Sequence, residues 1–408
     1  MIDANVLSSR QRLLLFVLAA INFLHIMDFM ILMPLAPQLI RTMKISAAQF
    51  SALVASYSIA AGLASFAGTF FVDRFPRKFM LLACFSGFIA GTFLCGLSGT
   101  YALLLAARIV TGLLGGIIGS QVMSLIADTF PPQVRGRATG IVMTGFSAAS
   151  VLGVPAGLFL GTLSGWYMPF FAIAVAGILV FLLALRVLPK GIRHLASARN
   201  RSTNSLLLLK DILSFPPHRM ALFFTVMVSF SHFTMVPFLS PYMVSNVGFR
   251  EIDLSYIYIT GGAVTLLSGP LIGRMADRHG AHLIYTGLIL MACIPQFFIT
   301  HLPPVPLMGA LSLTTLFFVF SGGRFVPSQT LTINSIDPRY RGGFMSLNSS
   351  LMQLSSGMAG FLAGKVVFTA ADGRLMNYGL LGFSTIFFSI VTIPIALRLG
   401  KMNKKSMS

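Results

Sequence analysis

Charged residues are scarce in this chain of 408 amino acids. They make up 10% of it, whereas water-soluble domains carry about 25%. Hydrophobic residues make up 56%, and the mean hydropathy is +0.85. Because so little polar surface is available to cover a globule in water, the composition excludes soluble, disordered and collagen-like proteins and indicates an integral membrane protein.

Acidic residues are the rarer kind of charge, with 10 Asp and Glu against 29 Lys and Arg, which gives a formal net charge of +19. In a soluble protein this excess would suggest a nucleic-acid partner. In a membrane protein it reflects topology instead, so no nucleic-acid partner is expected. Only three cysteines occur. Cys84 and Cys95 would lie roughly 16 Å apart along one helix, which excludes a disulfide between them.

Sequence motifs of catalysis are also missing. The chain has no glycine-rich loop followed by Lys-Ser or Lys-Thr, so a built-in ATP motor is excluded. It has no His and Cys cluster with metal spacing, no His-Glu-x-x-His and no Gly-x-Ser-x-Gly. We therefore expect no enzyme activity, no metal and no cofactor.

Long apolar stretches dominate what is present. A helix that crosses a bilayer needs about 20 residues, and twelve stretches reach this length, at roughly 13–39, 48–72, 79–98, 101–127, 137–163, 167–188, 219–246, 253–275, 281–301, 305–333, 343–369 and 376–398. They are too long and continuous for barrel strands. The sequence therefore predicts an all-α membrane protein with twelve transmembrane helices.

A polar, basic segment separates the sixth stretch from the seventh. It predicts a six-helix half over residues 1–188, a cytoplasmic linker over 189–218, and a second six-helix half with a short cytoplasmic tail over 219–408. If both termini are cytoplasmic, inner loops and tails hold 22 of the 29 basic residues and outer loops hold five. This distribution obeys the positive-inside rule and predicts that topology.

The two expected halves repeat each other at a nearly constant offset. His25 and His232 are 207 positions apart, and Gly115-Gly116 recurs as Gly322-Gly323 at the same distance. A duplicated six-helix unit is a transporter architecture, in which the substrate site lies between the halves near the membrane midplane.

The loop after the eighth stretch reads Gly273-Arg274-Met275-Ala276-Asp277-Arg278-His279-Gly280. It resembles the signature loop of the major facilitator superfamily. The copy after the second stretch has Thr69 and Pro76 in place of the glycines but keeps the Asp and Arg. An Asp beside an Arg at a helix end can cap a neighbouring helix and pair across the halves. With a second signature after the fourth and tenth stretches, the resemblance implies a major facilitator fold with gating positions at Asp73, Arg74, Arg77, Arg135, Gly273, Asp277, Arg278, Gly280 and Arg341.

Apart from charges near the span ends, Asp28 is the only acidic residue inside an expected span, and Arg108 and Arg324 are the two basic ones. Counted at 1.5 Å per residue, they lie roughly 22 Å and roughly 18–20 Å from the inner surface, so they can pair. The Arg108-x-x-x-Gly112 pattern and the stretch from Asp28 to Pro37 are similar to motifs of drug–proton antiporters. The pair is a candidate proton switch, since protonation of the Asp would end the pairing; the alternative is a static ion pair.

Three further side chains within the expected spans are functional candidates. His25 and His232 are candidates for proton relay, although a histidine in an apolar helix is often only hydrogen-bonded to a neighbouring helix. Arg324 is a candidate for binding an anionic substrate or for closing the inner gate.

The fifth stretch carries Gly153, Pro155 and Gly157. It resembles the antiporter signature of that span, with Val154 in place of the usual glycine, and implies a bendable helix; close glycine packing is the alternative reading. Five residues are candidates for lining the cavity, because they lie on helices that face the cleft in this superfamily: Tyr57, Phe233, Arg324, Asn348 and Gln353. The alternative is that they only pack against other helices or contact lipid.

The resemblance as a whole is to the bacterial twelve-span drug–proton antiporters, including sugar-efflux-like members. It implies export of a small drug-like, lipophilic or sugar-like solute by alternating access, with the proton as coupling ion. The alternatives are three. The protein could take up a small metabolite, which could be anionic, together with protons; it could be a facilitator without coupling; or it could be a non-transporting sensor or scaffold. Expected partners are the solute, protons and the lipid bilayer, and we expect a monomer in the bacterial cytoplasmic (inner) membrane.

Overall fold

Long apolar sequence stretches fold into long helices, because a helix satisfies its own backbone hydrogen bonds in lipid. The computed structural model describes residues 8–71, 75–189, 205–337 and 340–405. The first half comprises α1 (Ser9–Ile31), α2 (Ala36–Met43), α3 (Ala47–Phe71), α4 (Arg77–Leu97), α5 (Tyr101–Thr129), α6 (Pro132–Ala148), the π-helical turn η2 (Ala149–Gly153), α7 (Val154–Ser164) and α8 (Met168–Val187).

The second half follows a short helix, α10 (Ser205–Ser214), which lies within the predicted linker. It comprises α11 (Pro216–Phe233), η3 (Val236–Phe238), α12 (Leu239–Ser245), η4 (Glu251–Asp253), α13 (Leu254–His279), α14 (Ala281–Thr300), α15 (Leu307–Phe317), the π-helical turn η5 (Phe318–Gly322), α16 (Phe325–Asn334), α17 (Arg341–Val366) and α18 (Tyr378–Lys405). A small antiparallel hairpin of β1 (Phe368–Thr369) and β2 (Leu375–Met376) joins the last two helices.

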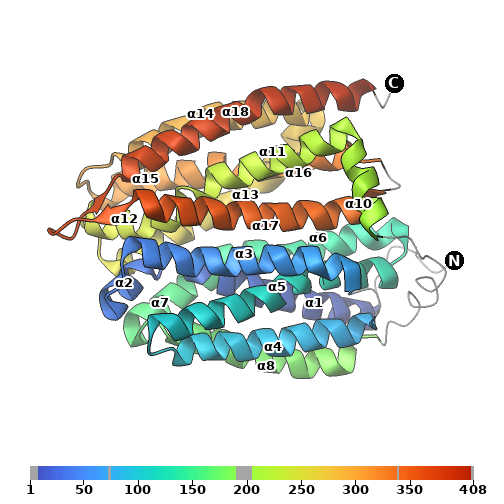
Figure 1. The fold of residues 1–408 in the computed structure, drawn as a ribbon, viewed down its shortest axis with the longest axis horizontal. Helices are drawn as coiled ribbons and strands as arrows, with labels where there is room; N and C mark the ends of the chain where they lie inside the picture. The colour runs from blue at the N-terminus through green and yellow to red at the C-terminus, as the bar shows by residue number, and fades with distance from the viewer. Residues whose placement is uncertain (1–7, 72–74, 190–204, 338–339, 406–408) are drawn as a thin grey trace.

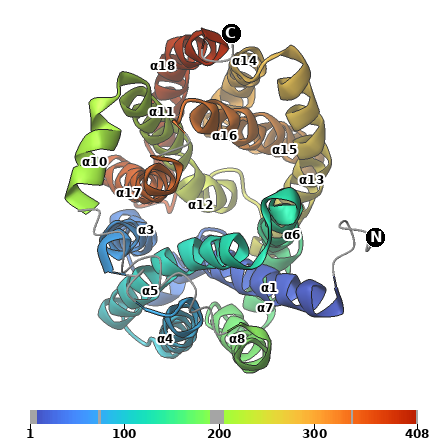
Figure 2. The ribbon, with the colours of Figure 1, turned by 90° about the vertical axis from the view of Figure 1, so that its right-hand side faces the viewer.

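The long helices run side by side along one axis, and both chain termini lie at the same end of the bundle (Figure 1). We call this the termini end, and the end that carries α2 and α12 the opposite end. Figure 2 views the bundle from the termini end and shows α1, α4, α5 and α8 on one side and α11, α14, α16 and α18 on the other. Two halves therefore lie next to each other, as the internal repeat predicts.

Several predicted spans are interrupted helices rather than continuous ones. The first span of each half breaks, after Ile31 in the first half and after Phe233 in the second. Pro34 and Pro237 lie within these breaks, and proline cannot donate the backbone hydrogen bond that a helix interior requires. The breaks end α1 after 23 residues and α11 after 18 residues.

Eleven helical segments in the described part of the chain are long and apolar enough to cross a membrane, whereas twelve were predicted. The remaining one is α17, which is long enough at 26 residues but contains five serines, Asn348 and Gln353. It packs mainly against α3 of the first half and α11 of its own half. A helix enclosed by other helices can carry polar side chains that lipid would exclude.

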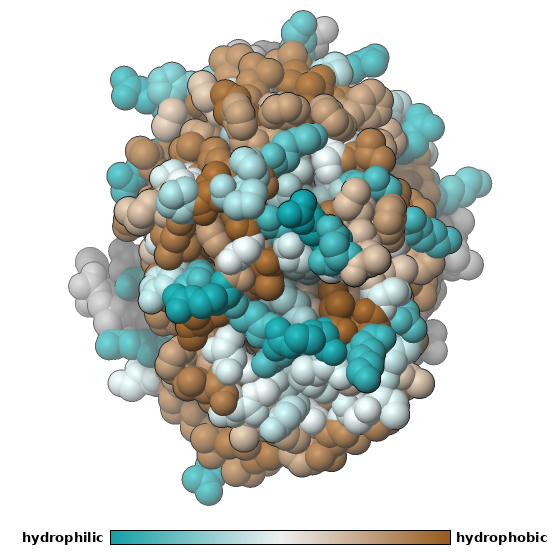
Figure 3. Space-filling model, turned by 90° about the vertical axis from the view of Figure 1, so that its left-hand side faces the viewer, coloured by the Kyte–Doolittle hydropathy of each residue, from teal (hydrophilic) through white to brown (hydrophobic). Residues whose placement is uncertain are grey.

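Besides the α3–α17 contact, the two halves meet at the opposite end. There α2 packs against α12, and α7 against α13, and Arg41 forms an ion pair with Glu251. A Cβ placed on Gly262 of α13 would lie 3.1 Å from the Cα of Val151 in η2, whereas Gly140 and Gly269, closer to the termini end, have no atom within 4 Å of such a position. Figure 3 shows hydrophilic side chains gathered across the middle of the opposite end, with apolar residues around them.

The Arg41–Glu251 ion pair provides a test of this closure. The Arg41 side chain is 65% exposed, and exposed pairs contribute about 0–1 kcal/mol. We expect Glu251→Gln to shift the open–closed equilibrium at this end by no more than about five-fold, measured as the distance distribution between spin labels on α2 and α12. Arg374→Gln, which breaks an exposed pair with Asp372 inside one half, is the matched control and should leave that distribution unchanged.

Candidate functional site

The structure brings Asp28 of α1 and Arg108 of α5 together in the interior of the first half. Arg108 donates from Nη1 to the Asp28 carboxylate over 2.8 Å and to the Asp28 backbone carbonyl over 3.3 Å. Thr92 of α4 donates to the other carboxylate oxygen over 3.1 Å. Both charged side chains are completely buried. Three helices therefore converge on one carboxylate, which accepts hydrogen bonds at both of its oxygens.

Tyr57 of α3 packs on the other face of this pair. The guanidinium carbon of Arg108 lies 4.4 Å from the centre of the Tyr57 ring, which is a cation–π contact. Glycines on α5 make this approach possible, because a Cβ on Gly115 would lie 2.6 Å from the Tyr57 hydroxyl oxygen and one on Gly112 would lie 2.9 Å from the Tyr57 Cα. The predicted cavity residue Tyr57 is therefore fully buried against Arg108 in this conformation.

His25 lies one helical turn before Asp28 on α1. Its ring contacts Tyr57 and Phe88, with centroid separations of 6.4 and 5.9 Å. Neither ring nitrogen has a hydrogen-bond partner among the described residues, although both nitrogens are buried. Buried polar atoms without a protein partner are commonly satisfied by ordered water.

Phe29 links this cluster to the second half. Its ring lies 5.4 Å from that of Tyr57 and 6.0 Å from that of Phe233 on α11. Of the other predicted cavity residues, Asn348 is buried and accepts a hydrogen bond from Thr225 over 2.7 Å, whereas Gln353 is half-buried on α17. Phe233 is therefore the predicted cavity residue that meets the first half through a ring contact.

Arg324, the second buried arginine, lies between η5 and α16. It donates from Nη1 to the Ser389 hydroxyl over 2.7 Å and from Nη2 to the Ser231 hydroxyl over 2.9 Å, with a longer contact of 3.5 Å to the Val228 carbonyl. The side chain is completely buried. Its partners in the described part of the chain are neutral, in contrast to the Asp28 partner of Arg108.

His232 lies next to Ser231 on α11, and its Nδ1 is 3.3 Å from the Ser321 hydroxyl. Gln296 of α14 donates to the same hydroxyl over 3.2 Å. The His232 ring stacks on Phe317, with planes 2° apart. The two histidines of the repeat therefore have different surroundings, because His232 has a hydrogen-bond partner and His25 has none in the described residues.

Motif residues near the termini end of the first half bind helix ends in this conformation. Arg77 pairs with Asp128 over 3.3 Å, which joins the start of α4 to the end of α5. Arg135 donates to the Ala127 and Phe130 carbonyls over 2.7 and 3.3 Å and thereby satisfies the last carbonyls of α5. Asp73 and Arg74 lie outside the described residues, and Arg341 begins α17 without a described side chain.

The second copy of the signature loop ends α13. Gly280 has φ 94°, a conformation that favours glycine, and makes the turn into α14. Gly273 has only Val326 near its Cβ position, at 3.8 Å. Asp277 and Arg278 are exposed, and within the described ranges no ion pair joins Asp277 to the other half. The expected pairing across the halves is therefore not made by Asp277 in this conformation; Arg41 and Glu251 make one at the opposite end instead.

The glycines of the fifth span allow η2 and α7 to approach α1. A Cβ on Gly153 would lie 3.1 Å from the Met27 sulfur, and one on Gly157 would lie 2.7 Å from Ile31. Pro155 is buried in the first turn of α7. The expected irregularity of this helix takes the form of a π-helical turn over Ala149–Gly153, a feature often found at functional sites.

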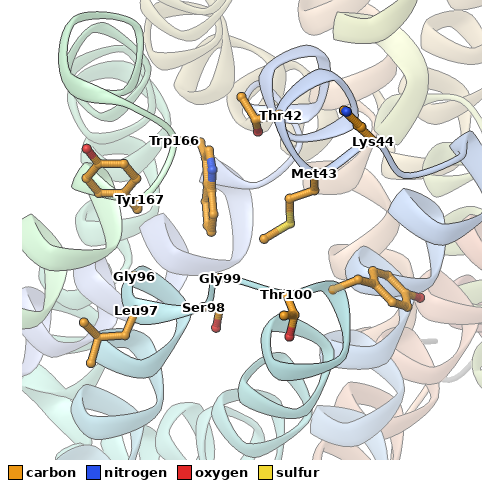
Figure 4. A pocket seen from close by; sticks show the side chains of 11 residues that line it. Thr42, Met43, Lys44, Gly96, Leu97, Ser98, Gly99, Thr100, Trp166 and Tyr167 are labelled. Atoms are coloured by element: carbon orange, nitrogen blue, oxygen red, sulfur yellow. The ribbon is translucent and has the colours of Figure 1, made fainter.

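A separate pocket of about 420 Å³ opens at the opposite end of the first half (Figure 4). It lies between the end of α2, the turn from α4 to α5 and the turn from α7 to α8. Its lining includes Lys44, Tyr101 and Trp166. None of the residues predicted from the sequence lines it, so it is distinct from the buried arginine sites.

Sequence reasoning missed the neutral side chains around the buried charges. Thr92 donates to Asp28, and Ser231 and Ser389 accept from Arg324; the available signal was that each is a polar residue in a largely apolar helix. It could not reveal which helices meet, because their partners are distant in the chain.

Comparison with known proteins identifies the family of this chain. The family model described as the Major Facilitator Superfamily matches residues 18–360 and 221–407. The chain belongs to the major facilitator superfamily. It is therefore a multi-pass membrane transporter rather than an enzyme, with the twelve-helix, two-half fold that the sequence motifs implied. Transporters of this superfamily bind small-molecule substrates and typically work as monomers.

Relatives of this superfamily transporter span nearly its whole length. It is 26% identical over 386 residues to the uncharacterized MFS-type transporter YceJ of Bacillus subtilis (strain 168), covering 93% of this chain and 94% of YceJ. A bacterial homologue of the human lysosomal transporter Spinster, solved in an inward-facing and occupied conformation, has a TM-score of 0.75 at 18% identity, with 97% and 98% of the two chains covered. A D-xylose–proton symporter has a TM-score of 0.76 at 15% identity, with 96% and 97% covered. At these identities the solved structures show a shared fold.

Proposed function

We propose that this transporter exports a small organic solute in exchange for protons that enter the cell, with Asp28 as the proton-carrying group. The observation that supports this most directly is the Asp28–Arg108 pair. Asp28 is completely buried in the interior of a described membrane span, whereas Asp253, the other buried acidic residue of the described spans, lies at a span end beside the exposed Arg250. A carboxylate in the interior of a span is costly and usually functional, and it can change charge when it takes up a proton.

The coupling step follows from the contacts of the pair. With a deprotonated Asp28, the ion pair holds α1 against α5 and Thr92 holds it against α4. Protonation removes the charge and leaves Arg108 with the backbone carbonyl of Asp28 and the Tyr57 ring. The charge attraction between α1 and α5 is then lost.

The next residue along α1 carries the change to the interface between the halves. Phe29 lies against Phe233 of the second half, directly before the break that ends α1 at Ile31. Release of Asp28 therefore loosens the one turn of α1 that touches the other half through an aromatic contact. Alternating access would use this link to couple proton entry to the movement of the halves.

The test measures accumulation of a panel of dyes and toxins in bacterial cells that lack their own pumps. We expect wild-type protein to lower the accumulation of at least one compound, and both an uncoupler and Asp28→Asn to abolish this effect. Asp372→Asn, an acidic residue in the exposed hairpin loop, is the matched control and should retain export.

Two results would contradict the proposal. Export by Asp28→Asn at the wild-type rate would exclude Asp28 as the proton carrier. Higher accumulation in cells that make the wild-type protein would reverse the direction and indicate proton-coupled uptake. Equal amounts of monodisperse protein on size-exclusion chromatography must accompany each variant.

A further inference from the structure

The two buried arginines differ in how their charges are balanced. Arg108 has the Asp28 carboxylate at 2.8 Å. Arg324 is equally buried, yet within the described residues no carboxylate lies within ion-pair distance of it. A guanidinium remains charged under all physiological conditions, so Arg324 cannot lower this imbalance by losing a proton. An uncompensated buried charge is strongly unfavourable, so an anion bound from outside the described residues would stabilise this site.

Two hydrogen-bond donors at Arg324 have no acceptor among the described residues. Its Nε is buried and has no partner among the described residues. The hydroxyl of Ser389 accepts from Arg324 and therefore keeps its own hydrogen available to donate. The edge of a guanidinium formed by Nε and Nη2 is suited to a carboxylate, which it binds through two parallel hydrogen bonds. Unused donors around a fixed positive charge suit an oxyanion.

The helix is irregular where Arg324 lies. The π-helical turn η5 ends at Gly322 and α16 begins at Phe325, which leaves Arg324 at the junction of two helical segments. Interrupted helices of this kind form the ligand sites of many transporters, and π-helical turns often mark functional positions.

The site is also connected to the interface between the halves. Ser231, which contacts Arg324, precedes His232 and Phe233 on α11, and Phe233 meets Phe29 of the first half. A solute held between the halves at Phe233 would therefore lie within a helical turn of residues that contact Arg324.

We propose that Arg324, with the hydroxyl of Ser389, binds the anionic group of the transported solute, which is a small organic carboxylate. This inference deepens the proposed function and rests on it for the statement that the ligand is transported. Binding itself depends only on the second half, whereas proton coupling depends on Asp28 in the first.

The experiment measures the melting temperature of the purified, detergent-solubilised transporter in buffer free of chloride and of carboxylates. The probes are acetate and benzoate, each with its neutral amide, acetamide and benzamide, and sodium chloride as the inorganic anion. We expect at least one carboxylate at millimolar concentration to raise the melting temperature by several degrees, as a ligand in large excess over its dissociation constant does. Its amide should not.

Variants test whether the stabilisation by carboxylates comes from binding at Arg324. The stabilisation should disappear in Arg324→Gln, weaken in Ser389→Ala and persist in Asp28→Asn. Stabilisation by chloride alone, equal stabilisation by the amides, no stabilisation by either carboxylate, or its persistence in folded Arg324→Gln would overturn the proposal. Arg324→Lys, which keeps the charge, provides a second variant if Arg324→Gln does not yield monodisperse protein, and a wild-type response in it would also count against bidentate carboxylate binding.

The outcomes separate this inference from the proposed function. If Asp28→Asn exports normally while carboxylates still bind through Arg324, the coupling proposal fails and the anion site stands. If Asp28→Asn abolishes export while no carboxylate binds in the wild type, the opposite holds.

Discussion

Arg108→Gln is expected to lower the melting temperature of the purified transporter by roughly 5 °C or more. The substitution leaves the Asp28 carboxylate completely buried with Thr92 as its remaining side-chain partner. Removing one partner of a buried ion pair costs about 3–5 kcal/mol, because the other charge is left uncompensated. Thermal unfolding followed by fluorescence in detergent measures the effect.

The double variant Asp28→Asn/Arg108→Gln should recover most of that loss, since neither charge remains. Arg41→Gln is the control for loss of an ion pair at the surface, and we expect a change of less than about 1 °C for it. Arg324→Gln should not lower the melting temperature in buffer without anions, because it removes an uncompensated charge. A loss in Arg324→Gln as large as that in Arg108→Gln would show that Arg324 is already balanced within the protein.

Gly116→Ala is expected to disrupt the first half more than any other single added methyl group on α5. A Cβ at this position would lie 2.7 Å from the Cα of Ala61 on α3. The obstacle is backbone, which cannot rotate away as a flexible side chain can, so α3 and α5 would have to separate. Overpacking of this kind costs about 1–3 kcal/mol or more, and here it would also displace the neighbouring contact of Tyr57 with Arg108.

Gly119→Ala is the matched control, because Gly119 lies one turn further along the same helix and has no atom within 4 Å of its Cβ position. Both substitutions gain the same helix propensity, so the difference between them reports the α3–α5 contact alone. The yield of monodisperse protein and its melting temperature are the measurements. Equal values for the two variants would show that α3 and α5 do not approach as closely as described.

The two halves of this transporter use the same kind of charge in different ways. In the first half, Asp28 is the counter-ion of Arg108, so protonation of Asp28 would change the interaction between the two side chains. In the second half, hydroxyl groups surround Arg324 and leave its charge available. The two proposals assign proton coupling to the first half and solute binding to the second, and the proposed experiments test each half separately.

Much of the fold could be predicted from the sequence. Hydropathy located the spans because lipid accepts few polar side chains, and the 207-residue offset between His25 and His232 indicated two related halves. The breaks after Ile31 and Phe233 were missed, although Pro34 and Pro237 were visible. Proline does not always interrupt a membrane helix, since α13, α14 and α18 each contain one within their bounds.

The sequence also predicted part of the candidate site. Counting the helical rise placed Asp28 and Arg108 at similar depth, and the structure shows them in contact. Depth alone does not reveal which face of a helix meets which neighbour. Tyr57 and Asn348 were therefore expected to line a cavity, and the structure places them in the interiors of their halves, on Arg108 and Thr225.

Composition and periodicity by themselves determined that this chain spans a membrane many times, that it is built from two related halves, and that its rare intramembrane charges are the residues to examine. These properties depend on the transfer of side chains between water and lipid, which each residue carries with it. Only the tertiary structure decided that Arg108 has a carboxylate partner and Arg324 has serines. Partners such as Ser389 lie 65 positions from Arg324 in the chain, and packing of whole helices, not local sequence, brings such residues within hydrogen-bond distance.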